Sequence, residues 1–110
     1  MNEPLFLESA RALAMRTLEE GGGTDVQRLT YAVRRCVART PTEQEASQLL
    51  ALLNKQMQRF DGGKLNPWDL AAADPAQPPA LPKGATPAQL AAWTAVSRVL
   101  LNLDETITKE

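Results

Sequence analysis

Few side chains in this sequence could carry out chemistry, because the chain contains no histidine. Histidine is the commonest general base near neutral pH and the commonest protein ligand of metal ions. The single cysteine, Cys36, cannot form an intrachain disulfide or a paired-thiolate metal site. Because Cys36 lies in an apolar helical stretch, we interpret it as a small buried hydrophobic side chain and not as a nucleophile.

The carboxylates and glycines offer no alternative chemistry. Neighbouring acidic residues occur in three places, at Glu19/Glu20, Glu43/Glu45 and Asp104/Glu105. Helix caps, helix ends and solvation account for all of these pairs. The glycine run 21–23 is not a phosphate-binding loop, because no strand pattern precedes it and no lysine with serine or threonine follows it. We therefore expect no enzyme activity, no catalytic residue, no metal site and no cofactor.

Arginine is the one charged residue type whose spacing suggests a binding surface. Arg28, Arg35 and Arg39 are separated by seven and four residues, which places them on one stripe of a helix. Such a stripe could contact nucleic-acid phosphates. However, the net charge is -1, and Glu43 and Glu45 follow the stripe and would repel phosphate. A solvated face, or pairing of the arginines with those carboxylates, is the favoured interpretation, and a protein-docking surface stays open.

Helical periodicity indicates four elements that would position these residues. The expected helices cover residues 4–20, 25–39, 43–60 and 87–103. The last three follow capping-box patterns, at Thr24/Gln27, Thr42/Glu45 and Thr86/Gln89. Pro41 pushes the residue before it out of the α region, so the second helix is expected to stop near Thr40. Its apolar face is expected to consist of Val26, Leu29, Val33, Cys36 and Val37.

Residues 61–86 lack periodicity and contain five of the eight prolines. A loop of this length is unusual in a compact domain, so it either wraps the surface or is mobile. Trp68 and Leu70 are the bulky apolar residues near its start. They could pin the loop to the helices, or Trp68 could be an exposed anchor for a partner. The candidate interaction surface therefore consists of Arg28, Arg35, Arg39 and Trp68.

These elements predict one all-α domain spanning residues 1–110, a small orthogonal or antiparallel bundle of about four helices with a long proline-rich loop before the last one. The last helix must cover the apolar faces of the first three, with Trp93 in the core. No stretch approaches the roughly 20 apolar residues of a membrane span, and no signal peptide is visible. We expect neither a membrane nor nucleic acid as a partner, and the sequence does not define an oligomeric state.

Several short motifs occur in a familiar order. Residues 39–45, Arg-Thr-Pro-Thr-Glu-Gln-Glu, are similar to an Arg-x-Pro-Thr-x-x-Glu signature. Trp93 followed by residues 100–105, Leu-Leu-Asn-Leu-Asp-Glu, is similar to a Trp-then-Leu-Leu-Asn-x-x-Glu ending. Residues 2–6 and 10–14 also fit. Together they resemble a planctomycete-type C-terminal domain of unknown function, found downstream of cytochrome c-like domains in large exported proteins. At Ala38 the resemblance leads us to expect glycine.

The resemblance implies that Met1 is not the true start and that the chain is part of a larger periplasmic or extracellular protein. Any haem would belong to a separate domain, because this chain has no Cys-x-x-Cys-His. The leading hypothesis is a non-catalytic structural or protein-interaction module that contacts other domains of its parent or another protein. One alternative is an accessory domain in which Arg39 or a carboxylate completes an active site of a neighbouring domain. A second is weak nucleic-acid binding.

Overall fold

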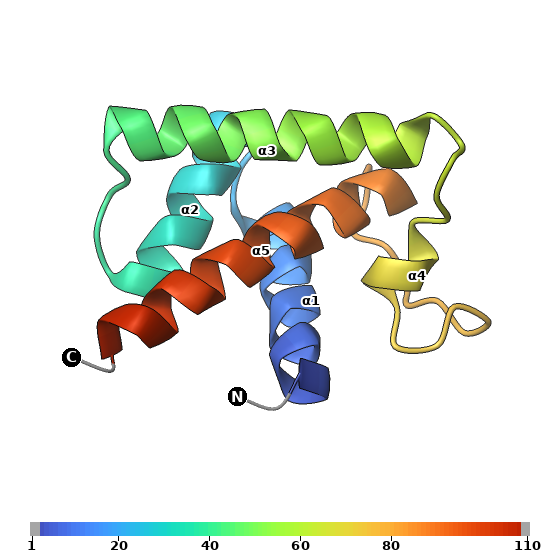
Figure 1. Cartoon of the computed structure of the whole chain (residues 1–110). Helices are drawn as coiled ribbons and strands as arrows, with labels where there is room; N and C mark the ends of the chain where they lie inside the picture. The colour runs from blue at the N-terminus through green and yellow to red at the C-terminus, as the bar shows by residue number, and fades with distance from the viewer. Residues whose placement is uncertain (1–2, 109–110) are drawn as a thin grey trace.

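The computed structural model describes the backbone of residues 3–108 and the side chains of residues 6–103. Over this part of the chain the regular structure is entirely helical, as the sequence predicts. The helices are α1 (Glu3–Glu20), α2 (Asp25–Val37), α3 (Glu43–Asp61), α4 (Trp68–Ala71) and α5 (Pro87–Thr108). In Figure 1, α5 crosses in front of α1 and α2, α3 runs along one edge, and α4 lies at the far end of α3.

All three predicted capping boxes are present. The Thr42 hydroxyl accepts from the Glu45 amide at 3.1 Å, and the Glu45 carboxylate accepts from the Thr42 amide at 2.9 Å. The same reciprocal bonds join Thr24 with Gln27 and Thr86 with Gln89. Because each box satisfies amides that the first helical turn leaves unpaired, these threonines set where α2, α3 and α5 begin.

Two helix ends differ from the prediction by more than one residue. α2 stops at Val37 and not near Thr40, because Ala38 adopts a left-handed conformation with φ 58° and its amide donates to the Arg34 carbonyl at 3.0 Å. The left-handed turn at Ala38 therefore ends α2 three residues before the chain reaches Pro41. α5 continues to Thr108, five residues beyond the expected end at residue 103. This stretch contains neither glycine nor proline, and its residues are compatible with a helix.

The expected loop 61–86 contains a short helix, α4, so the bundle has five helices and not four among the described residues. Just before α4, the Asn66 side chain accepts from the Trp68 amide at 3.1 Å. Trp68 and Leu70 are half-buried against the core, and this confirms that they pin the loop. Four residues are too few for helical periodicity to reveal, which explains why the sequence pattern missed α4.

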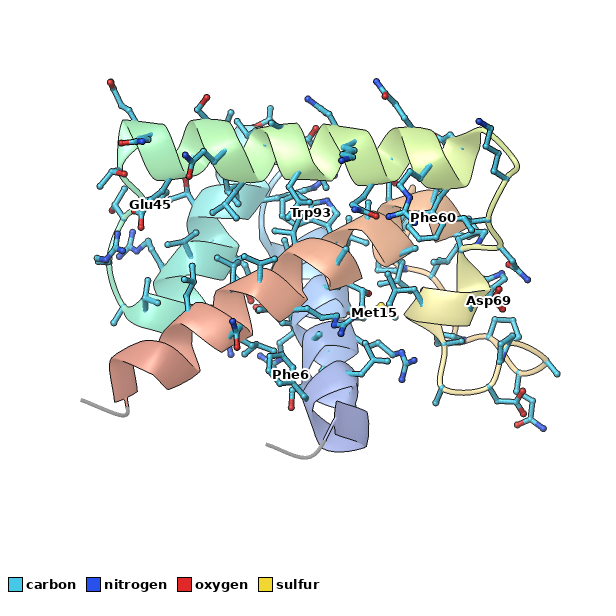
Figure 2. All side chains as sticks on the ribbon, viewed as in Figure 1. Phe6, Met15, Glu45, Phe60, Asp69 and Trp93 are labelled. Atoms are coloured by element: carbon cyan, nitrogen blue, oxygen red, sulfur yellow. The ribbon has the colours of Figure 1, made fainter. Side chains whose placement is uncertain are left out.

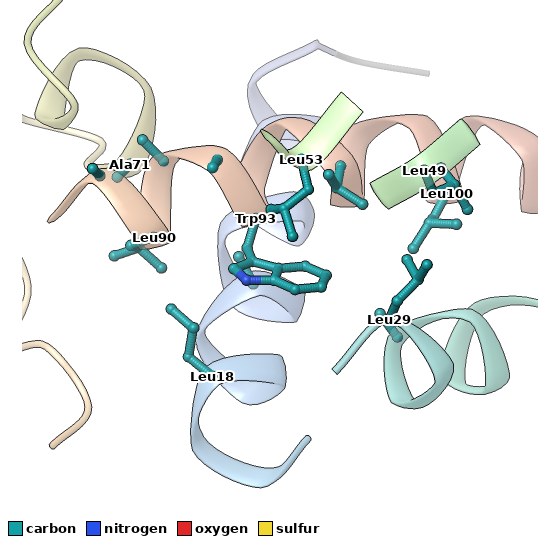
Figure 3. Close-up of a cluster of buried hydrophobic side chains, with 14 of the residues drawn as sticks. Leu18, Leu29, Leu49, Leu53, Ala71, Leu90, Trp93 and Leu100 are labelled. Atoms are coloured by element: carbon teal, nitrogen blue, oxygen red, sulfur yellow. The ribbon is translucent and has the colours of Figure 1, made fainter. Parts of the chain in front are cut away.

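α5 is the central helix, because it contacts each of the other four. Trp93 lies in the middle of α5 with 1 % of its surface exposed. Figure 3 shows its ring between Leu53 of α3 and Leu18 of α1, with Leu29 and Leu100 continuing the core toward α2. The prediction that the last helix covers the first three, with Trp93 in the core, is confirmed.

Hydroxyl-bearing residues are also buried in α1 and α5. Thr17 and Thr94 donate to the carbonyls of Leu13 and Leu90 at 2.8 and 2.7 Å, so both hydroxyls are satisfied within their own helix. Ser97 is fully buried, and its hydroxyl has no hydrogen-bond partner among the described residues. Small side chains at these positions let two helices pack closely, and α1 and α5 make the most extensive contact in the fold.

Candidate functional site

The arginine stripe predicted from the sequence does not exist as a continuous helical surface. Arg28 and Arg35 lie on α2, but Arg39 lies beyond its end, after the left-handed Ala38. The turn at Ala38 changes the chain direction, so the seven-plus-four spacing no longer places Arg39 above Arg35. Each of the three arginines instead has its own partner within the chain.

Arg28 holds the turn between α1 and α2. Its Nε donates to the Gly22 carbonyl at 3.2 Å, and its Nη1 lies 3.6 Å from the Asp25 carboxylate. The Arg28 side chain is only 19 % exposed, although it is charged. These contacts give Arg28 a structural role at the start of α2.

Arg35 stacks on an aromatic ring. Its guanidinium carbon lies 5.6 Å from the centre of the Tyr31 ring, within the range of a cation–π contact. The Tyr31 hydroxyl donates to Glu20 at 3.0 Å, which joins α2 to the end of α1. The pKa of the Tyr31 hydroxyl is raised. Partial burial is the larger cause, and the hydrogen bond to Glu20 acts in the same direction. Arg35 is therefore the outer member of a contact chain that ends on α1.

Arg39 forms the strongest polar contact described in the structure. Its Nη1 and Nη2 each donate to one oxygen of Glu45 at 2.7 Å, in a two-bond arrangement. This confirms the predicted pairing of an arginine with a carboxylate after the turn. The hydrogen bonds from Arg39 and from the Thr42 amide lower the pKa of Glu45 to about 2. Glu45, which Figure 2 shows near the start of α3, thus closes the capping box and also holds Arg39.

The Arg39–Glu45 pair lines part of an apolar groove. The groove has a volume of about 440 Å³ and lies between α2, α3 and the second half of α5. We call it the α2–α3–α5 groove, and it is lined by Val33, Val37, Arg39, Glu45, Gln48, Leu49, Leu52, Val99, Leu100 and Leu103. Its volume falls within the range of binding pockets, and most of its lining is hydrophobic.

Two lining residues of this groove are unusually exposed for their type. Val99 is 39 % and Leu103 is 43 % exposed, and they lie one turn apart on α5. Both belong to the apolar face of the last helix, and sequence reasoning did not identify the groove. The apolar residues themselves recur to residue 103, but the sequence does not show which of them α2 and α3 leave uncovered.

Other sequence-predicted features lie apart from the groove. Trp68 is half-buried on α4 and is not a lining residue. Val26, expected on the buried face of α2, is 59 % exposed because the buried part of α2 begins at Leu29. Cys36 is half-buried and packs against the core.

The carboxylates whose side chains the structure describes do not gather into a metal site. No three His, Cys, Asp or Glu residues are arranged to hold a metal ion within the described part of the chain. The predicted Asp104/Glu105 pair lies outside the described side chains. Glu19 and Glu20 are exposed at the end of α1, where Glu20 accepts from Tyr31.

Comparison of the chain with protein-family models, with curated proteins and with solved structures finds no match. Among the described residues, no helix combines the length and the apolar character that crossing a bilayer requires.

Proposed function

We propose that this chain is a non-catalytic interaction module of a larger exported multidomain protein, and that the α2–α3–α5 groove receives an apolar segment of a neighbouring domain. The observation that carries the proposal is the pair of uncovered side chains, Val99 and Leu103, at the open side of an apolar groove. Large exposed apolar residues that share one hollow are typical of a protein-contact surface.

The form of the groove suits a helical or extended segment. Val33, Leu49 and Leu100 are buried and form its base, whereas Val99 and Leu103 stand at its edge. A docked apolar side chain would remove both Val99 and Leu103 from water. Burial of apolar surface stabilises a complex by about 25 cal/mol per Å². Recognition of an apolar face in such a groove is a recurring mode of peptide binding.

The polar pair in the groove, Arg39 and Glu45, can orient a docked segment. Arg39 and Glu45 keep about half and one third of their side-chain surface exposed while bonded to each other. Peptide groups of a docked segment can hydrogen-bond to the remaining N–H groups of Arg39 and the remaining lone pairs of Glu45. These bonds would not separate the pair. The groove therefore offers apolar contacts from most of its lining and polar contacts from Arg39 and Glu45.

The family resemblance supports the placement in a larger exported protein. The resemblance leads us to expect glycine at residue 38, and Ala38 has the positive φ that favours glycine. A periplasmic or extracellular location, and cytochrome c-like neighbours, belong to the same proposal.

The alternatives receive less support from the contacts. For Arg39 to complete an active site elsewhere, it would have to leave two 2.7 Å hydrogen bonds to Glu45. For nucleic-acid binding, Arg28 and Arg35 would present phosphate contacts from a chain whose net charge is -1.

The test uses the separately expressed chain and the remainder of its parent. Leu103→Glu places a charge at the edge of the groove, and it should abolish association because that charge would be buried without a partner. The matched control is Val26→Glu, which makes the same kind of change at an exposed residue of α2 outside the groove. Association is measured by size-exclusion chromatography and calorimetry.

Retained association with Leu103→Glu, or equal loss with Val26→Glu, would contradict the proposal. Thermal unfolding of both variants should match the unchanged chain, because both positions are exposed. An immunoblot of periplasmic and cytoplasmic fractions of the source cell tests the parent itself. A periplasmic band much heavier than 12.0 kDa is expected, and a band near 12.0 kDa would remove the neighbouring domain from the proposal.

A further inference from the structure

A second hollow lies between α1, the proline-rich segment and the first turn of α5. We call it the Arg11 cleft; it has a volume of about 470 Å³. Ala12 and Met15 line it from α1, Ala72 and Pro79 from the segment after α4, and Leu90 from α5. This volume lies within the range of sites for small molecules.

The apolar wall of the cleft is preformed. Leu90 and Ala72 are buried, with 1 % and 2 % of their surface exposed, and form its fixed base. Met15 is half-buried and packs against the core, and its flexible thioether side chain adapts to the shape of an apolar ligand. The alanines leave space because their side chains end at Cβ. The cleft can therefore hold an aliphatic chain without moving a helix.

Arg11 places one positive charge at this apolar wall. Its Nε donates to the Leu70 carbonyl at 2.8 Å, which fixes the guanidinium between α1 and α4. This is the hydrogen bond that the structure gives Arg11, and none of the ion pairs between described side chains involves it. The two Nη groups carry four N–H donors and match the two oxygens of a carboxylate.

The surroundings of Arg11 favour an anion with a single charge. Desolvation lowers the pKa of Arg11, against the smaller opposite effect of Glu8, and a less hydrated guanidinium interacts more strongly with an anion. Asp74 also lines the cleft, with its Oδ1 accepting from the Ala76 amide at 2.9 Å. The charge of Asp74 repels a dianion, such as a phosphate ester, about twice as strongly as it repels a single carboxylate.

We propose that the Arg11 cleft binds a small amphipathic carboxylate of the medium-chain fatty acid type. The carboxylate pairs with the Nη groups of Arg11, and the alkyl chain lies against Met15 and Leu90. The site is separate from the α2–α3–α5 groove, since the two share no lining residue. Fatty-acid binding in the Arg11 cleft is therefore independent of the proposed docking function.

The test is a titration of the ¹⁵N-labelled chain with octanoate, followed by amide chemical shifts. Saturable shifts are expected at Met15, Ala72 and Ala73. Octanol has the same chain without the charge, and it should bind about tenfold more weakly, as expected for loss of one charge-assisted contact. Arg11→Gln should weaken octanoate binding by about the same factor, whereas Arg16→Gln, an exposed arginine of α1 outside the cleft, should not.

A second variant separates binding from structure, because Arg11→Gln also alters the contact with Leu70. Ala12→Phe introduces a ring at an exposed position on the cleft wall and leaves Arg11 in place. It should abolish octanoate binding with an unchanged unfolding midpoint. Equal binding of octanol and octanoate, unchanged binding by Arg11→Gln or Ala12→Phe, or shifts confined to Val99 and Leu103 would each overturn the proposal. Leu103→Glu should leave octanoate binding intact.

Discussion

At the scale of single residues, Glu45 carries two tasks with one carboxylate. Its Oε1 accepts from the Thr42 amide to cap α3, and both oxygens accept from Arg39. The cap and a pairing of an arginine with Glu43 or Glu45 were both predictable from the residue order. The choice of Arg39 over Arg35 was not, because it depends on the left-handed turn at Ala38.

The lowered pKa of Glu45 predicts a dependence of stability on pH. Its pKa of about 2 in the folded chain lies below the ordinary value of 4.5, so the unfolded chain binds more protons. The stabilisation is therefore present above pH 4.5 and is lost as pH falls toward 2. Glu45→Gln keeps the capping pattern but removes the charge. Urea unfolding from pH 6 to 2 should show a shallower loss in this variant.

Glu43→Gln is the matched control, because Glu43 is an exposed acidic residue in the same turn. It should retain the pH dependence of the unchanged chain. An identical pH dependence in Glu45→Gln and the unchanged chain would show that Arg39 does not stabilise the Glu45 carboxylate.

Ala38 predicts a stabilising substitution. Its φ of 58° is costly for a residue with a Cβ, and glycine adopts it freely. Ala38→Gly should therefore raise the free energy of unfolding by about 1 kcal/mol, measured by urea denaturation. The same substitution at Ala51, an exposed position inside α3, should lower it by about 1 kcal/mol. A loss of stability at both positions would contradict the strained turn.

At the scale of elements, threonine caps and apolar periodicity located four of the five helices. The starts of α2, α3 and α5 follow from local hydrogen bonds, so the sequence pattern predicted them well. α4 depends on tertiary packing of Trp68 and Leu70, which periodicity does not report. The Arg11 cleft was missed for the same reason, since its wall combines α1 with a segment that has no period.

The packing of Trp68 predicts that the proline-rich segment is held through α4. Trp68→Ala should lower the free energy of unfolding by about 1–3 kcal/mol, less than for a fully buried aromatic residue. It should also speed tryptic cleavage after Lys83, because the segment loses its attachment to the core. Unchanged cleavage and stability would mean that Leu70 and Leu81 hold the segment without Trp68.

At the scale of the whole molecule, the fold depends on one helix that contacts all the others. The sequence predicted the all-α class and the covering role of the last helix, because its apolar face is the broadest. The extent of the uncovered part was not predictable, since it depends on how far α2 and α3 reach along α5. Val99 and Leu103 are exposed because α2 and α3 leave them uncovered.

The central position of Trp93 predicts a global effect of its removal. Trp93→Ala should cost about 3–5 kcal/mol, as for other buried aromatic residues. For a small domain this is a large part of the total stability, so urea and thermal midpoints should fall sharply. Val26→Ala is the control and should change stability by less than about 0.5 kcal/mol. A midpoint unchanged by Trp93→Ala would contradict the packing around α5.

The groove is tested most directly by photo-crosslinking in the intact parent protein. A photoreactive amino acid replaces Leu103 in the groove, or Val26 outside it. The proposed docking function predicts that the probe at residue 103 crosslinks to one defined peptide of a neighbouring domain, identified by mass spectrometry, and that the probe at residue 26 does not. Crosslinks from residue 103 confined to α2, α3 and α5, or the same peptide captured from both positions, would contradict it.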